Sequence, residues 1–219
     1  MSAPATNNGS AWAPPSTART RLVLVRHGVT DYSIDKRFAG RSDLPLTADG
    51  QEQARRAARR VLALGPVDAI VSSPLRRTRQ TAELIAERAQ RPVTICDGVI
   101  ETDFGAWDGL TFAQARQQSP ELMSRWLADP SVAPPGGEAF DAVTSRVRGA
   151  LEQLLDGHAG ETVALVSHVT PIKVLVRLAL DAPPTALHRM FLAPAAISVV
   201  DYYADGPVSL QSFNDTSHL

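Results

Sequence analysis

The chain has 219 residues, of which 44% are hydrophobic and 21% charged, and its formal net charge is −1. These values are typical of a globular protein with a sizeable core, and the near-neutral charge argues against a broad nucleic-acid-binding surface. The single cysteine, Cys96, excludes a disulfide framework and a thiolate zinc cluster, and it favours a reducing, cytoplasmic location. No apolar run is long enough to span a bilayer, and the N-terminus lacks the apolar segment of a signal peptide, so we expect no membrane contact.

The first 20 residues are rich in Ala, Pro, Ser, Thr and Asn. A segment of this composition buries too little apolar surface to offset the entropy that it loses on ordering. We therefore expect residues 1–20 to form a disordered tail or linker, and residues 21–219 to form one domain.

Strand and helix patterns alternate along the rest of the chain. Leu22–Val25 is a continuous apolar run typical of a buried strand, and residues 48–64 carry apolar positions on one helical face. Ser73-Pro74 is a helix-start pattern, because Ser can cap a helix and Pro is favoured at its first position. The other predicted elements are strands at 68–72, 93–96 and 162–167, helices at 74–90, 111–128, 138–156 and 170–180, and a hairpin of strands at 196–203 and 208–213.

The order of these elements predicts the fold class. Strands that alternate with helices form a mostly parallel sheet that is covered on both faces. We expect an α/β fold with three layers, α/β/α, in which the late hairpin adds an antiparallel edge strand to the central sheet.

Two of the predicted strands end in a histidine. Arg26-His27 follows the apolar run Leu22–Val25, and Ser167-His168 ends the strand at 162–167. In open α/β sheets, ligands bind outside the carboxyl ends of the strands. The two histidines can therefore converge on one ligand although they are far apart in the sequence.

Two further strand ends add charged side chains. Arg76 and Arg77 follow the strand at 68–72, and Glu101 follows the strand at 93–96. The planar fork of arginine binds phosphate oxygens in pairs, and a neutral imidazole is a competent nucleophile toward phosphorus. A nearby carboxyl group can protonate a leaving oxygen. These residue types indicate a site for a phosphate dianion that requires no metal ion and no other cofactor.

Arg26-His27-Gly28 with Thr30 resembles the RHG signature of the histidine phosphatase superfamily, also called phosphoglycerate-mutase-like. Five further segments, in the same order along residues 21–219, are similar to motifs of that family. They are the segment 40–54 around Pro45-Leu46-Thr47, the segment 73–82 that begins Ser73-Pro74-Leu75, the segment 101–109 from Glu101, Pro135-Gly136-Gly137-Glu138, and Ser167-His168.

The resemblance implies a catalytic role for five residues. His27 would attack phosphorus and become a phosphohistidine, while Arg26, Arg77 and His168 would clamp the phosphoryl oxygens. Glu101 would protonate the leaving alcohol and then help water to attack the phosphohistidine.

The resemblance also implies how substrate is held. Gly28 would leave room for phosphate, and its carbonyl would orient the ring of His27. Ser33 stands where the family often has Asn, and its hydroxyl could donate to phosphate with a shorter reach. The expected substrate-binding residues are Arg26, Gly28, Ser33, Arg77, His168 and Val169.

Three functions are compatible with these residues. The first is a metal-independent phosphomonoester hydrolase, most similar to the acid phosphatase or alpha-ribazole-phosphatase-like domain of bifunctional ribonuclease H/acid phosphatase proteins. The second is a phosphoglycerate mutase, and the third is a non-catalytic phospho-ligand-binding module. The first implies a small phosphomonoester substrate, no nucleic acid bound by this domain, and a chain that could belong to a larger protein with a ribonuclease H domain. A homodimer is also compatible with the sequence.

Overall fold

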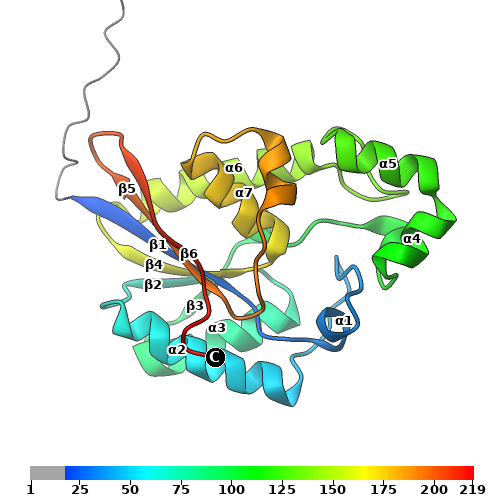
Figure 1. Cartoon of the computed structure of the whole chain (residues 1–219). Helices are drawn as coiled ribbons and strands as arrows, with labels where there is room; N and C mark the ends of the chain where they lie inside the picture. Colours follow the sequence, from blue (N-terminus) through cyan, green and yellow to red (C-terminus); the bar gives the residue numbers. More distant parts are fainter. Residues whose placement is uncertain (1–17) are drawn as a thin grey trace, which may run out of the picture.

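Six strands form one sheet in the order β3-β2-β4-β1-β5-β6, in a computed structural model that describes residues 18–219 (Figure 1). β1 pairs in parallel with β4, β4 with β2, and β2 with β3, whereas β5 runs antiparallel to both β1 and β6. The expected parallel sheet with an antiparallel edge is confirmed. The strands are β1 (Arg19–Arg26), β2 (Ala69–Ser72), β3 (Val93–Ile95), β4 (Thr162–Ser167), β5 (Ile197–Tyr203) and β6 (Val208–Asp215).

Helices cover both faces of the sheet, which gives the expected three layers. α2 (Ala48–Ala63) and α3 (Arg76–Ala89) lie together on one face, and α6 (Phe140–Gly157) and α7 (Val169–Ala179) lie on the other (Figure 1). α4 (Phe112–Gln118) and α5 (Pro120–Ala128) project beyond the sheet, on the side where α1 (Asp31–Ile34) also lies.

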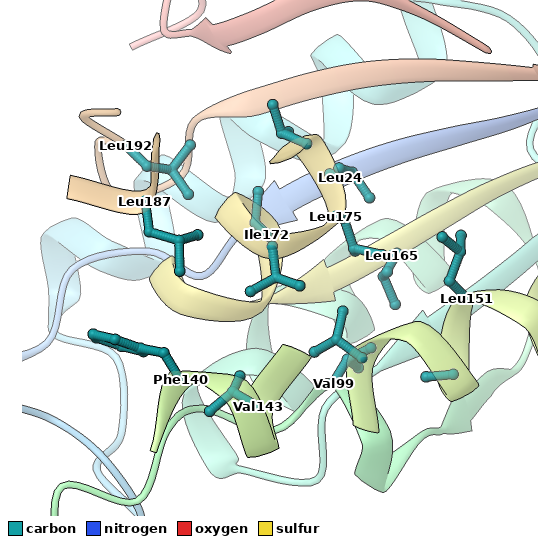
Figure 2. Close-up of a cluster of buried hydrophobic side chains, with 14 of the residues drawn as sticks. Leu24, Val99, Phe140, Val143, Leu151, Leu165, Ile172, Leu175, Leu187 and Leu192 are labelled. Carbon is teal, nitrogen blue, oxygen red and sulfur yellow. The ribbon is translucent and has the colours of Figure 1, made fainter. Parts of the chain in front are cut away.

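Alternate residues of the central strand β1 belong to the two cores. Leu22 and Leu24 pack with residues of α6 and α7, and Val23 and Val25 pack with residues of α2 and α3. Successive side chains of a strand point to opposite faces, so a strand that is covered twice is apolar at every position. This explains the unbroken apolar run before Arg26. Figure 2 shows Leu24 in this core, together with Val143 of α6 and Ile172 of α7.

Several predicted boundaries differ from those of the structure. β1 begins at Arg19, so residues 19 and 20 belong to the sheet, while residues 1–17 of the expected tail lie outside the described residues. The helix expected at 111–128 is divided at Ser119, because Pro120 begins α5 and has no N–H for the preceding turn.

The prediction that Ser73 caps the next helix is wrong. α3 begins at Arg76 with Leu75 at its N-cap, because the hydroxyl of Ser73 bonds His168 instead. The structure also contains α1 and three short 3₁₀ helices that the sequence pattern does not indicate, η1 (Asp97–Val99), η2 (Gly105–Trp107) and η3 (Pro184–Arg189). None of the helices within residues 18–219 combines the length and the apolar character needed to cross a membrane.

Candidate active site

The carboxyl ends of β1 and β4 bring the two histidines together. Arg26 pairs in register with Ser167, and the N–H of His27 donates to the Ser167 carbonyl at 3.1 Å. The imidazole rings of His27 and His168 follow, with centroids 5.2 Å apart and planes at 62°. The convergence expected from the sequence is therefore present, and it results from the parallel pairing of these two strands.

The His27 ring is held by the backbone of the next residue. Its Nδ1 lies 2.7 Å from the Gly28 carbonyl oxygen, which can only accept a hydrogen bond, so Nδ1 carries the proton and Nε2 carries the lone pair. Burial lowers the pKa of His27 well below 6.5, and the nearby Arg77 and Arg26 lower it further. The ring is thus a neutral imidazole with a free nitrogen at neutral pH.

Two glycines let the chain approach closely at this point. A Cβ on Gly28 would collide with the Gly50 carbonyl, and a Cβ on Gly50 would collide with the Val29 carbonyl. Gly50 lies in the first turn of α2, where the Thr47 side chain caps the helix by accepting from the Gly50 N–H at 3.0 Å. The loop after β1 therefore rests directly on the start of α2.

Arg26 keeps donor groups for a ligand. Its Nη1 donates to the Leu192 carbonyl at 2.6 Å, whereas its buried Nε has no partner among the described residues. Burial lowers the pKa of Arg26 to about 10, which still leaves the guanidinium charged at neutral pH. A buried cation with an unpartnered donor is a suitable anion ligand.

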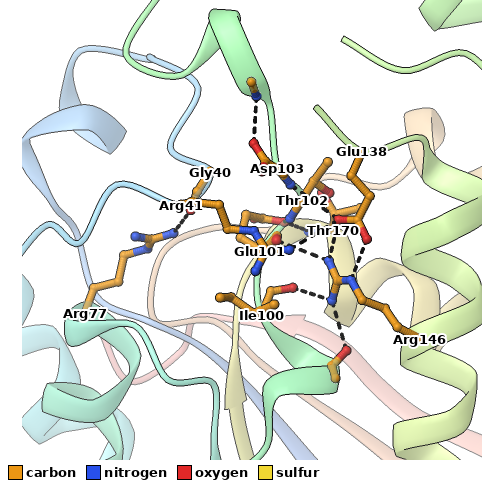
Figure 3. A network of polar contacts seen from close by, with 12 residues as sticks. Gly40, Arg41, Arg77, Ile100, Glu101, Thr102, Asp103, Glu138, Arg146 and Thr170 are labelled. Atoms are coloured by element: carbon orange, nitrogen blue, oxygen red, sulfur yellow. Dashed lines mark hydrogen bonds and ion pairs between the residues drawn. The ribbon is translucent and has the colours of Figure 1, made fainter. Parts of the chain in front are cut away.

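Glu101 is buried at the cavity wall and its carboxylate is anchored. Oε1 accepts from the N–H of Thr102 at 2.9 Å and from that of Thr170, in the first turn of α7, at 3.3 Å. Behind it, Arg146 of α6 donates to the Glu101 carbonyl at 3.1 Å and forms a paired salt bridge with Glu138 (Figure 3). Arg146 was not among the expected site residues, and only its link to Glu138 of the Pro-Gly-Gly-Glu segment could have indicated it.

Arg77 and His168 lie behind His27 and do not line the cavity. All three nitrogens of Arg77 donate within the protein: Nε to His168 Nδ1 at 3.2 Å, and Nη1 and Nη2 to backbone carbonyls of residues 39–42. Because an arginine Nε can only donate, Nδ1 of His168 accepts, and Nε2–H donates to the Ser73 hydroxyl at 2.7 Å.

The other predicted substrate-binding residues occupy different positions. Ser33 and Val169 line the cavity, whereas Gly28 is buried against α2. The Ser33 hydroxyl donates to the Thr30 carbonyl at 2.8 Å and accepts from the Thr30 N–H, so it is part of the α1 cap. Ser33 therefore has no free hydroxyl proton in this arrangement.

The cavity in front of His27 has a volume of about 270 Å³. One part of its wall is formed by Arg26, His27, Glu101 and the start of α7. Another part is apolar, because the aromatic rings of Phe38, Phe104 and Phe140, from three separate segments, gather around Trp126 of α5. The apolar residues of this wall are Phe38, Phe104, Trp126, Phe140 and Leu187.

Three further cationic or titratable side chains line the cavity, and none of them belongs to a motif that the sequence pattern indicates. They are Arg37, Lys173 on α7, and His188 on η3, which stacks edge-on with Trp126 and Phe140. His188 lies at the cavity wall although it is far from the carboxyl ends of the strands in the sequence. Lys173 comes four residues after Val169 and so shares a helical face with that predicted binding residue, a spacing that would have indicated it once α7 was placed at the strand end.

The fold and the two histidine-ending strands define a class of phosphoryl-binding α/β proteins. The chain belongs to the histidine phosphatase superfamily, branch 1, whose family profile matches residues 22–216. The resemblance of the sequence motifs is thereby confirmed.

Three curated relatives are similar in sequence. A bifunctional protein of Mycobacterium tuberculosis is 46% identical over 208 residues, which cover 95% of this chain and 57% of the relative. Phosphoserine phosphatase 1 of Hydrogenobacter thermophilus is 36% identical over 200 residues, and a probable phosphoglycerate mutase of Cronobacter sakazakii is 35% identical over 206 residues. Each of these two alignments covers 91% of this chain and 94% of the relative.

A solved structure supports the same family. The mycobacterial glucosyl-3-phosphoglycerate phosphatase, in a complex with VO3, superimposes with a TM-score of 0.81 at 32% identity, covering 90% of this chain and 99% of that one. By contrast, the chain spans little more than half the length of the mycobacterial bifunctional relative.

Proposed function

We propose that the protein is a phosphomonoester hydrolase that forms a phosphohistidine at Nε2 of His27. The observation that carries this proposal is the hydrogen bond from His27 Nδ1 to the Gly28 carbonyl, which leaves a neutral nitrogen free beside Arg26 and Glu101. Family membership and the phosphatases among the similar proteins support it.

The reaction has two steps on these residues. The Nε2 lone pair attacks phosphorus, the ester P–O bond breaks, and the protonated Glu101 gives its proton to the leaving alkoxide. Water then attacks phosphorus as the N–P bond breaks, and the Glu101 carboxylate takes a proton from that water. Inorganic phosphate leaves and His27 is again neutral.

Arg26 stabilises the charge that develops on the phosphoryl oxygens. In this proposal Arg77 reaches the same oxygens when it exchanges some of its bonds to the carbonyls of residues 39–42 for bonds to phosphate. His168 reaches them when its Nε2–H leaves the Ser73 hydroxyl and donates to phosphate. The backbone N–H of Val169, in the first turn of α7, adds a further donor. The arginines supply the positive charge, so the proposed chemistry needs no metal ion.

The finer assignments are also part of the proposal. An acid phosphatase is supported by the lowered pKa of His27, because the nucleophile then stays neutral below pH 6.5. A partner domain in a longer chain, with ribonuclease H as the expected activity, is supported by the length and the name of the bifunctional relative. The single cysteine supports a cytoplasmic location, and the homodimer remains a prediction.

The test is hydrolysis of p-nitrophenyl phosphate by the purified chain. We expect His27→Ala to lose the activity, and His158→Ala, a histidine that pairs with Glu161 away from the cavity, to keep it. Equal turnover by the wild type and His27→Ala would contradict the proposal. The mutase alternative predicts that interconversion of 3- and 2-phosphoglycerate exceeds phosphate release, and measuring both rates distinguishes the two.

A further inference from the structure

Lys173 is a cation of the cavity wall that the proposed chemistry does not use. It lies on α7, is half-buried, and its Nζ donates to the Leu187 carbonyl at 3.1 Å. It forms no salt bridge with a carboxylate of the described residues. An ammonium has three donors, so two remain for a ligand.

Burial lowers the pKa of Lys173 and the charge of Glu101 opposes this shift, but no salt bridge joins the two side chains. Glu101 is the only carboxylate in the described cavity wall, and its Oε1 already accepts two backbone N–H groups. Arg37, the other cation apart from Arg26, donates to Asp35 and to the Gly109 carbonyl. Outside the phosphoryl site, Lys173 is therefore the cation of this wall that is available to bind an anionic group of the ligand.

The rest of the wall restricts what that ligand can be. A cavity of about 270 Å³ lies just below the usual range for ligand sites, which favours a small substrate. The apolar wall around Trp126 offers no partners for several hydroxyl groups, and a hydroxyl that is buried there without a partner is destabilised. A compact molecule with one further charged group fits this wall better than a sugar phosphate does.

We propose that Lys173 binds a carboxylate on the alcohol portion of the substrate, so that the enzyme selects small phosphomonoesters of hydroxy acids. This inference rests on the proposed function, because it assumes that the phosphoryl group of the same molecule lies at His27. Lys173 then acts on specificity: it holds the far end of the substrate while His27, Arg26 and Glu101 act on the phosphoryl group.

The experiment compares two substrates that differ at one group. 3-Phosphoglycerate carries a carboxylate where glycerol 3-phosphate carries a hydroxymethyl group. We expect the wild type to show a higher kcat/KM for 3-phosphoglycerate, by about tenfold or more, because a hydrogen bond to a charged group adds roughly that factor to binding. Hydrolysis of p-nitrophenyl phosphate is measured on the same samples.

Three variants test the residue. Lys173→Met keeps the length of the side chain without its charge, and it should lower the 3-phosphoglycerate to glycerol 3-phosphate ratio by about 10- to 100-fold. Lys173→Arg should keep most of the ratio. Arg189→Gln removes an exposed cation one residue after His188 that does not line the cavity, and it should leave the ratio unchanged.

The outcomes separate this inference from the proposed function. The role of Lys173 is overturned if the wild type has equal kcat/KM for 3-phosphoglycerate and glycerol 3-phosphate, or if Lys173→Met lowers kcat/KM equally for both. In either case, hydrolysis of p-nitrophenyl phosphate that depends on His27 still upholds the proposed function. Calorimetric binding of both compounds to His27→Ala tests Lys173 even if no compound is hydrolysed. Equal dissociation constants there would also overturn it.

Discussion

The ends of β1 and β4 are alike in sequence and different in what their histidines can do. Each is an apolar strand that leads into a buried histidine, and the two rings lie 5.2 Å apart. His27 is fixed at one nitrogen and faces the cavity with the other, whereas both nitrogens of His168 are bonded to Arg77 and Ser73. The sequence pattern thus locates two histidines, and the hydrogen-bond partners distinguish the proposed nucleophile, His27, from a histidine whose two nitrogens are both bonded within the protein.

The largest effect should come from replacing each histidine in turn. His27→Ala should lower kcat/KM for p-nitrophenyl phosphate on the order of 10⁴-fold or more and abolish labelled phosphoenzyme, because the nucleophile is gone. His168→Asn should lose less activity and still form phosphoenzyme. Protein labelled from a ³²P-phosphomonoester and quenched in alkali measures this. Phosphoenzyme that persists in His27→Ala but disappears in His168→Asn would reverse the two roles.

The next effect concerns Glu101, the proposed general acid. Glu101→Gln keeps the shape of the side chain but has no proton to give, so kcat should fall about 10²- to 10⁴-fold. The loss should be smaller for p-nitrophenyl phosphate than for an alkyl phosphate, since a good leaving group needs less protonation. An equal loss on both substrates would argue that Glu101 acts only in the second step or through structure.

A smaller effect is expected from the hydroxyl that holds His168. Ser73→Ala leaves the buried Nε2–H of His168 without a partner, which should destabilise the fold by about 1–3 kcal/mol. Ser72→Ala is the matched control, because this neighbouring buried hydroxyl donates only to the Ser73 carbonyl. Thermal unfolding of both variants checks the prediction, and an equally large loss in Ser72→Ala would show that His168 is not the cause.

The smallest effect, on stability against pH, should be shared by the two histidines. Burial, followed by Arg77, lowers the pKa of both well below 6.5. Below pH 6.5 the unfolded chain takes up protons that the folded chain does not, so stability falls with decreasing pH, by up to about 1.4 kcal/mol per pH unit for each histidine. Unfolding from pH 7.5 to 5.5 should show this slope, reduced in His168→Asn. An unchanged slope in that variant would remove His168 from this window.

Much of this site could be predicted from the sequence, because its chemistry follows strand ends. The apolar runs before Arg26 and His168 locate the sheet edge, and parallel pairing brings the ends together. The partners of each side chain could not be predicted in this way. The Ser73 hydroxyl could cap the next helix but bonds the distant His168, and Arg77 donates to carbonyls of residues 39–42. Both sets of contacts form only when separate segments of the chain pack together.

The residues of the cavity wall likewise could not be predicted from the sequence pattern. Phe38, Phe104, Trp126 and Phe140 come from four separate segments, and no spacing in the sequence relates them. The division of the helix at Ser119 places Trp126 on its own short helix, α5. Substrate selection therefore depends on elements that the pattern of strands and helices does not describe.

The close contact of Gly28 with Gly50 determines which ring nitrogen of His27 carries the proton. The carbonyl that fixes the ring belongs to Gly28, and Gly28 can occupy its place only because neither glycine has a side chain. Two missing methyl groups, far from each other in the sequence, thereby decide which ring nitrogen is free to react. Because a Cβ at either position would collide with a backbone carbonyl, we expect a side chain at either one to displace the carbonyl that sets the tautomer.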